Sequence, residues 1–260
     1  MQPLIYLSYG MTKSGSTLAY QLARTAMVAA GMDQPLLNIP ALRKTKHINF
    51  IEQLEPWRLE AVMDQARALG HAIVLKTHSR PDQPIMRELL ESGLAIGHAC
   101  LRDPRDMALS MLDHGARSRR AGKGEFSEFH LVDAALANIR QQTETLRQWL
   151  CLPNILPLAY EELAFDTVSA TRKILKQLNI QINPAHIAEI VLDAGQTNKN
   201  LGKPSRHPQQ MAAQTSAEIA DEFAPLINQF ILQRAKLPQT GHAILAAGDR
   251  LHHQPLEPAL

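Results

Sequence analysis

The loop YGMTKSGST, residues 9–17, joins an apolar run to a segment with helical periodicity. The phosphate-binding pattern G-x-x-x-x-G-K-[ST] can be laid over Gly10 to Thr17, but Ser16 stands where lysine is expected and Lys13 lies in the middle of the loop. Backbone N–H groups and the positive end of a helix dipole favour a bound phosphate or similar anion. The loop therefore indicates an anion site. The competing interpretation is an ordinary strand-to-helix turn with solvated polar residues.

Strand-like and helix-like segments alternate along the rest of the chain. Short apolar runs bounded by turn residues predict strands, and longer segments with apolar residues at helical spacing predict helices. The strands are expected at 4–9, 71–78, 94–102 and 154–160. The helices are expected at 16–31, 56–70, 84–93, 103–116, 131–150, 167–180, 184–195 and 216–235. This order predicts an α/β domain with a parallel sheet flanked by helices and a ligand site at the carboxyl ends of the strands.

Length and composition indicate one domain. A chain of 260 residues with 45% hydrophobic residues can bury a sizeable core. We expect the domain to span residues 1–237, followed by a loosely ordered tail at 238–260, where little pattern remains. The net charge of +2 gives no overall attraction to nucleic acid or anionic membranes, so any anion site is local.

The chain shows no sequence feature of export or membrane insertion. It starts with a strand-like run, without a basic segment followed by a long apolar stretch, so we expect no signal peptide and no membrane anchor. Cys100 and Cys151 lack the spacing of a disulfide scaffold or a metal site. The histidines, including His252 and His253, also lack companion ligands for a metal. We therefore expect a cytoplasmic protein without a metal centre.

Two further groups of polar residues follow predicted strands. In VLKTH, Lys76 and His78 are two residues apart, so a strand turns both side chains toward the same face. Histidine can accept a hydroxyl proton near neutral pH, and lysine can neutralise charge on a transferring group. In CLRDPRDMALS, Arg102 ends a strand, Asp103 is placed to cap a helix and Ser110 lies two turns along it. Arg102 and Ser110 can both hold a phosphate, although an arginine paired with a neighbouring aspartate and a solvated serine would give the same pattern.

These segments, in this order, resemble the sulfotransferases that use 3′-phosphoadenosine 5′-phosphosulfate (PAPS). TKSGST (12–17) resembles their 5′-phosphosulfate loop, LKTH (75–78) their lysine and histidine segment, and LRDPRDMALS (101–110) their 3′-phosphate motif. LAYEELAFDTVSATRKILKQLNI (158–180) is similar to their tyrosine-acidic-acidic stretch and the helix after it. The resemblance covers about residues 3–180 and implies a single-domain sulfotransferase fold related to P-loop NTPases.

The resemblance also implies a role for each matching residue. Lys13 would contact the phosphosulfate and its bridging oxygen, His78 would deprotonate the acceptor as general base, and Lys76 would stabilise charge on the sulfuryl group. The residues implied in PAPS binding are Lys13, Ser14, Gly15, Ser16 and Thr17 at the 5′ end, Arg102 and Ser110 at the 3′-phosphate, and Tyr160 in the tyrosine-acidic-acidic stretch. The family's C-terminal Arg-Lys-Gly motif is absent, and Lys203 and Arg206 are the candidates for its task. Both could equally be solvated loop charges.

The transferred group explains why the loop lacks the Walker lysine. A magnesium-dependent triphosphatase would need a lysine at position 16 and an aspartate at a strand end, and neither is present. The sulfuryl group carries less charge than a γ-phosphoryl group, so a lysine in mid-loop and backbone donors can supply the electrostatics without a metal. The function expected is sulfuryl transfer from PAPS to an acceptor hydroxyl.

The acceptor is defined only loosely by the sequence. An aromatic content of 5% is low for a pocket that grips phenols, which favours an aliphatic alcohol, a lipid or a sugar as the acceptor. We expect no nucleic-acid partner. The basic segment HGARSRRAGKGEFSEF (114–129) is either a mobile lid over the site or a solvated loop. Two other functions fit the same motifs less well: a small-metabolite kinase that uses Mg-ATP, and a nucleotide-binding relative without activity.

Overall fold

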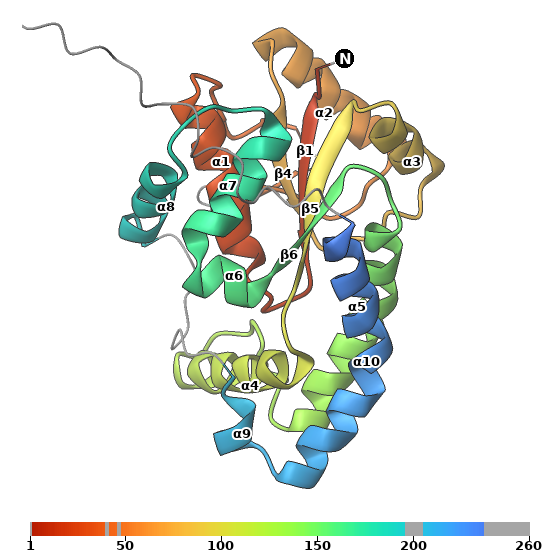
Figure 1. The fold of residues 1–260 in the computed structure, drawn as a ribbon, viewed down its shortest axis with the longest axis vertical. Helices are drawn as coiled ribbons and strands as arrows, with labels where there is room; N and C mark the ends of the chain where they lie inside the picture. Colours follow the sequence, from red (N-terminus) through yellow and green to blue (C-terminus); the bar gives the residue numbers. More distant parts are fainter. Residues whose placement is uncertain (1, 40–41, 46–47, 196–204, 237–260) are drawn as a thin grey trace, which may run out of the picture.

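The computed structural model describes residues 2–39, 42–45, 48–195 and 205–236, and a six-stranded sheet runs through its centre (Figure 1). The strand order is β2-β3-β4-β1-β5-β6. Five strands are parallel, and β2 pairs antiparallel with β3 at one edge. The strands are β1 (Ile5–Gly10), β2 (Leu42–Thr45), β3 (Ile48–Ile51), β4 (Ile73–Thr77), β5 (Ala95–Leu101) and β6 (Ile155–Ala159). The expected α/β class with a parallel central sheet is confirmed.

Helices cover both faces of the sheet. One face carries α1, α7 and α8, and the other carries α2, α3, α5 and α10, while α4 lies beyond the carboxyl ends of the strands (Figure 1). The helices are α1 (Ser16–Ala29), α2 (Pro56–Leu69), α3 (Pro84–Glu91), α4 (Pro104–Arg120), α5 (Val132–Leu150), α6 (Tyr160–Phe165), α7 (Thr167–Leu178), α8 (Pro184–Asp193), α9 (His207–Gln210) and α10 (Ala213–Ala235). The two faces define two hydrophobic clusters, separated by the sheet.

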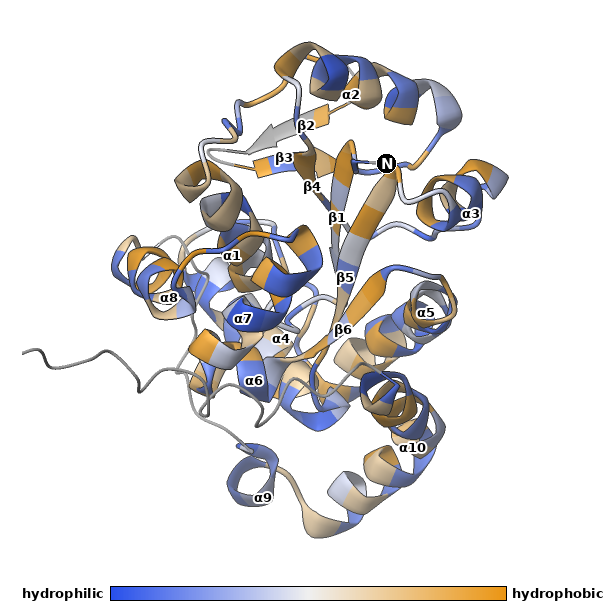
Figure 2. Ribbon diagram, turned by 45° about the horizontal axis from the view of Figure 1, so that its top comes forward, coloured by the Kyte–Doolittle hydropathy of each residue, from blue (hydrophilic) through white to orange (hydrophobic). Residues whose placement is uncertain are grey.

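The central strands are buried on both sides. Every residue of β1 and of β4 is buried, as a parallel sheet between two helical layers requires. Figure 2 shows hydrophobic residues along the strands, whereas the outer helices alternate hydrophobic and hydrophilic residues. At Gly97 in β5, a Cβ atom would lie 2.2 Å from the carbonyl oxygen of Leu7, so only glycine lets β5 approach β1 this closely.

The sequence located most of the elements but missed four of them. The four expected strands correspond to β1, β4, β5 and β6, and the eight expected helices to α1–α5, α7, α8 and α10. The short elements β2, β3, α6 and α9 have four to six residues each, too few for a clear periodic pattern. The expected tail at 238–260 lies outside the described residues.

The helix lengths and the cysteines bear on membrane insertion and on disulfides. Over the part of the chain that the structure describes, no helix combines the length and apolarity needed to cross a bilayer. Both cysteines are free; Cys100 is buried at the end of β5, and Cys151 is exposed after α5.

Candidate active site

The opening loop lies at the carboxyl end of β1 and is braced by its own short-range contacts. The Ser14 hydroxyl donates to the carbonyl oxygen of Met11 at 2.6 Å, and the Ser14 N–H donates to the same oxygen at 3.1 Å. Lys13 and Gly15 both have left-handed backbone conformations, with φ of 69° and 87°. A lysine in this region is uncommon and costs conformational energy.

The two glycines keep the loop free of side chains where it packs most tightly. A Cβ atom at Gly10 would lie 2.7 Å from the Cβ atom of Ser16, and one at Gly15 would lie 3.1 Å from the Tyr160 ring. Gly15 precedes α1 directly, and no side chain caps this helix. Its first N–H groups therefore face the loop with the positive end of the dipole behind them.

Lys76 and His78 both reach back to this loop. Lys76, at 7% exposure, donates from Nζ to the hydroxyl oxygen of Thr17 at 2.7 Å. His78 donates from Nδ1 to the carbonyl oxygen of Gly10 at 2.6 Å, because a carbonyl can only accept. This contact fixes the neutral tautomer with an unprotonated Nε2, the form that can accept a proton.

The environment keeps His78 neutral. Burial, and then the positive charge of Lys76, lower the pKa of His78 to about 4, although the hydrogen bond to Gly10 opposes this shift. Burial also lowers the pKa of Lys76 to about 8, and Lys13 contributes in the same direction. Phe50 lies beside the histidine, with ring centroids 5.6 Å apart. His78 is therefore an unprotonated base next to a cation and an aromatic ring.

Lys13 is covered by His114 of α4 and by Phe126 of the turn that follows this helix. Its Nζ donates to Nδ1 of His114 at 3.1 Å and lies 5.3 Å from the centre of the Phe126 ring, which itself stacks on His114 with centroids 4.3 Å apart. Burial and the charges of Arg117 and Arg102 lower the pKa of Lys13 to about 8. The charge of Lys13 also lowers the pKa of Lys76, so the two lysines lie near one another. The structure thus brings three expected side chains, Lys13, Lys76 and His78, together around the loop.

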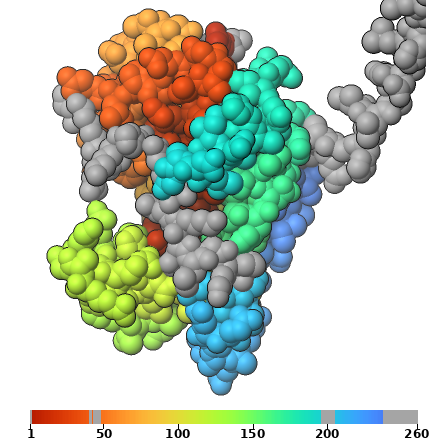
Figure 3. Space-filling model, turned by 90° about the vertical axis from the view of Figure 1, so that its left-hand side faces the viewer, coloured from red at the N-terminus to blue at the C-terminus, as the bar shows by residue number. Residues whose placement is uncertain are grey.

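In the basic segment 114–129, residues 114–120 are helical, whereas residues 121–128 form a turn-rich stretch with mostly exposed side chains, so the expectation of a solvated loop holds for this second part. Its first part continues α4 to Arg120, and its second part folds back, because Arg119 donates to the carbonyl oxygens of Ser127 and Phe129. Gly115 makes room for this turn, since a Cβ atom there would lie 2.5 Å from the Phe126 carbonyl oxygen. On the face shown in Figure 3, a hollow separates this region from the N-terminal elements.

Arg102 forms the second cluster of the site, at the end of β5. It is 5% exposed, its guanidinium lies 3.9 Å above the centre of the Tyr160 ring, and one terminal nitrogen lies 3.5 Å from Asp106. The competing interpretation, an arginine paired with Asp103 or Asp106, is therefore borne out at Asp106, whereas Asp103 binds Arg105.

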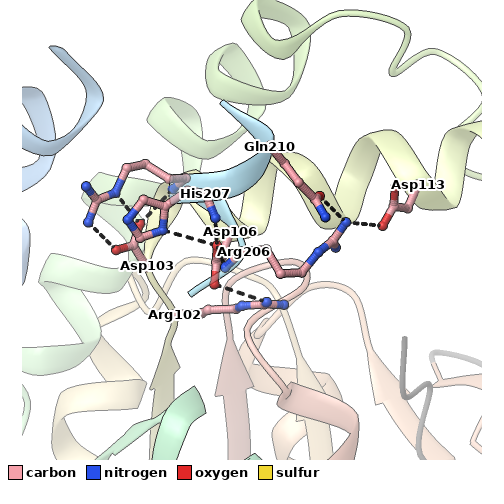
Figure 4. A network of polar contacts seen from close by, with 8 residues as sticks. Arg102, Asp103, Asp106, Asp113, Arg206, His207 and Gln210 are labelled. Atoms are coloured by element: carbon pink, nitrogen blue, oxygen red, sulfur yellow. Dashed lines mark hydrogen bonds and ion pairs between the residues drawn. The ribbon is translucent and has the colours of Figure 1, made fainter. Parts of the chain in front are cut away.

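Arg206 joins this cluster from a distant part of the chain. It is 6% exposed, so it is not a solvated loop charge, and it pairs with Asp113 at 2.8 Å and with Gln210 at 2.7 Å (Figure 4). The Nε atoms of Arg102 and Arg206 are both buried without a hydrogen-bond partner. A buried unpaired donor is costly unless water or an anion satisfies it. The Nε atom of Arg147 in α5 is unpaired in the same way, so what distinguishes Arg102 and Arg206 is that both also contact Asp106. Lys203, the other candidate, lies outside the described residues.

Ser110 and Ser16 complete the expected set. Both are buried, at 2% and 6% exposure, Ser110 in the second turn of α4 and Ser16 at the start of α1. Among the described residues, no group of three or more His, Cys, Asp or Glu side chains is arranged to hold a metal ion. A surface cavity of about 860 Å³ opens at the opposite ends of the strands, near Pro3, Ile96 and Gln177, and includes none of the site residues.

Sequence reasoning missed several residues that support the site. Trp149, fully buried in α5, stacks on Tyr9 with centroids 5.1 Å apart and donates to the Ser79 carbonyl oxygen at 2.9 Å. It thereby contacts the residue before Gly10 and the residue after His78. Gln142 of α5 accepts from the Thr12 N–H at 2.7 Å. Neither residue belongs to a local motif. The one sequence signal for them is that an aromatic and a polar residue stand in the apolar periodicity of a predicted helix.

Comparisons with known proteins agree with this geometry. A family model described as "Sulfotransferase domain" matches residues 6–222. Mouse sulfotransferase SULT7A1, solved in complex with PAP, is similar in structure with a TM-score of 0.58 and 14% identity, covering 90% of this chain and 87% of that chain. Retinol dehydratase, solved with androsterone and inactive cofactor PAP, gives a TM-score of 0.52 and 14% identity, covering 89% and 81%. A search of curated proteins finds no match.

Proposed function

Since the chain belongs to the sulfotransferase domain family, we propose that it transfers the sulfuryl group of PAPS to a hydroxyl of a small-molecule acceptor, with His78 as general base. The observation that carries this proposal is the pair of buried arginine Nε donors at Arg102 and Arg206, close to the loop that begins at Gly10. A donor with anionic groups at both its 5′ and 3′ positions would satisfy both clusters, whereas ATP has no 3′-phosphate.

The loop suits the 5′ end of PAPS. The glycines let the loop pack closely against Ser16 and Tyr160, and the start of α1 offers N–H groups with a favourable dipole. The hydroxyls of Ser16 and Thr17 and the Lys13 ammonium add donors, and the Ser14 hydroxyl holds the loop through Met11. The structural relatives SULT7A1 and retinol dehydratase were both solved with PAP, adenosine 3′,5′-bisphosphate, the product that PAPS leaves.

The second cluster suits the 3′-phosphate. Arg102 and Arg206 present Nε–H groups without a protein partner. Ser110 lies in the second turn of α4, and the Arg102 guanidinium lies 3.9 Å from the centre of the Tyr160 ring. Guanidinium groups bind phosphate more strongly than neutral donors do.

The transfer step needs one base and local positive charge. The acceptor oxygen forms a bond to sulfur as the bond from sulfur to the bridging oxygen breaks, and the acceptor proton passes to Nε2 of His78. The leaving PAP takes the electron pair of the broken bond. Lys13 and Lys76 stabilise the negative charge that develops on the bridging and sulfuryl oxygens.

The acceptor is proposed to be a small alcohol with an apolar skeleton. The Phe50 ring lies next to His78, and the Phe126 ring lies over Lys13, so apolar surface flanks both reacting groups. Retinol dehydratase has been solved with androsterone and with retinol, which supports an acceptor of this kind.

The test is calorimetric titration of the purified protein with PAP, without metal, and in parallel with Mg-ATP. Tight binding of PAP followed by transfer of labelled sulfate from PAPS to a panel of small alcohols would support the proposal. Binding of Mg-ATP in preference to PAP would contradict it.

A further inference from the structure

Asp106, in the first turn of α4, is the centre of the polar network in Figure 4. We infer that Asp106 is a positioning residue: it docks the chain at Arg206 and His207 onto α4, and thereby brings a second arginine beside Arg102. This inference rests on the proposed function, because its effect is selectivity for the 3′-phosphate of PAPS.

The Asp106 carboxylate contacts two segments that are 100 residues apart in the sequence. Its Oδ1 accepts the N–H of Arg206 at 2.9 Å, the N–H of His207 at 3.0 Å and Nδ1 of His207 at 3.3 Å. Its Oδ2 lies 3.5 Å from a terminal nitrogen of Arg102. The residue is 1% exposed, so these protein groups, rather than bulk water, satisfy its charge.

Asp106 accepts from the backbone N–H of Arg206, so the Arg206 side chain is free of Asp106 and can reach other groups. The N–H groups of residues 206 and 207 begin the short helix α9 and have no partner within it. Asp106 supplies their acceptor. The Arg206 guanidinium then pairs with Asp113 of α4 and donates a hydrogen bond to Gln210 of α9. One carboxylate therefore orients one arginine by its side chain and the other by its backbone.

Charge alone predicts that replacing Asp106 strengthens PAP binding, whereas a positioning role predicts that it weakens PAP binding. A buried carboxylate beside two phosphate-binding arginines repels a bound anion, so neutralising it would strengthen PAP binding by Coulomb interaction. If Asp106 positions Arg206, its removal weakens PAP binding instead. The sign of the change thus separates positioning from simple electrostatics.

The experiment measures the affinities of PAP and AMP, which lacks the 3′-phosphate, by calorimetry for the full chain and its variants. We expect Asp106→Ala to lower the ratio of PAP to AMP affinity by about tenfold or more, the size of a lost charge-assisted contact. Arg206→Ala should cause a loss of similar size, and Asp106→Asn, which retains one oxygen acceptor, a smaller one. Asp64→Asn, an exposed aspartate paired with Arg67 on α2, is the matched control and should leave the ratio unchanged.

The outcomes separate the two proposals. If the unmodified protein binds PAP no more tightly than AMP, the proposed function fails. If it prefers PAP and Asp106→Ala keeps or raises that preference, the positioning role of Asp106 is overturned. Should Asp106→Ala not fold, hydrogen exchange on the unmodified protein decides: the amides of Arg206 and His207 are expected to be protected, and fast exchange at both would overturn the inference.

Discussion

The two clusters that we propose to bind PAPS are built in different ways. The loop at 10–17 is held partly by contacts between neighbours, such as Ser14 with Met11, and partly by Gln142, Lys76 and His78 from other elements. The cluster of Arg102 and Arg206 is assembled from segments about 100 residues apart. The loop has its polar groups together in the sequence, whereas Arg102 and Arg206 come together only when residues 206–207 dock onto α4. We therefore expect the first cluster to supply general phosphate affinity and the second to supply selectivity for the 3′-phosphate.

The largest effect is expected at the base that the loop orients. His78→Ala should lower kcat by roughly 100- to 10,000-fold while PAP affinity stays nearly the same, because Nε2 is the proton acceptor but makes no phosphate contact. Steady-state kinetics with calorimetry of PAP checks both quantities. His71→Ala, at the other end of β4, is the control. An unchanged turnover would remove His78 from the mechanism.

The next effect distinguishes the distant cluster from the loop. Arg102→Ala should lower the affinity for PAP by about 10- to 100-fold and the affinity for AMP far less, since only PAP carries the 3′-phosphate. Titrations with the two nucleotides measure the difference. Equal losses for both would mean that Arg102 does not recognise the 3′-phosphate.

The matching change in the loop should lack this selectivity. Gly15→Ala places a Cβ atom 3.1 Å from the Tyr160 ring on a residue with a φ of 87°. We expect about tenfold weaker binding of PAP and AMP alike, and a loss of about 1 kcal/mol in the free energy of unfolding. Gly122→Ala also lies at positive φ but has open space around it, so it controls for backbone strain. A loss confined to PAP would contradict the division between the clusters.

The pH dependence should reflect the buried groups around the loop. His78 acts only when neutral, so with a pKa of about 4 it stays active down to that pH and loses activity below it. Lys13 and Lys76 act only when protonated, and with pKa values of about 8 they lose charge above that pH. The value of kcat/KM for PAPS in the free enzyme should thus be flat between these limits, fall about tenfold per pH unit below them, and fall up to about a hundredfold per pH unit above them, where two lysines lose their protons. A rise centred near pH 6.5, the ordinary pKa of histidine, would contradict the assignment.

The smallest effect is expected at the residue that joins the loop to the base. Trp149→Phe keeps the stacking on Tyr9 but loses the hydrogen bond to the Ser79 carbonyl, worth about 0.5–1.5 kcal/mol. We expect kcat to fall about three- to tenfold at constant KM for PAPS. Trp57→Phe, on an exposed residue of α2, is the control. A reduced melting temperature with unchanged kcat would make Trp149 purely structural.

The difference between the clusters also explains what could be read from the sequence. The loop, the Lys76 and His78 segment and Arg102 were recognisable because strand, turn and helix signals within a few residues put each of them at the carboxyl end of a parallel strand. The short strands β2 and β3 were missed because four residues carry no readable period, and Arg206 could only be named as one of two candidates.

The sequence by itself determined the α/β order, the loop and the residue types at the strand ends, because these depend on local periodicity and on neighbours. Only the tertiary structure decided which distant groups meet: Asp106 with the backbone at 206–207, Trp149 with Ser79, and Phe126 with Lys13. Burial then set the pKa values of His78 and Lys13, because desolvation depends on the atoms packed around a group and not on its neighbours in the chain.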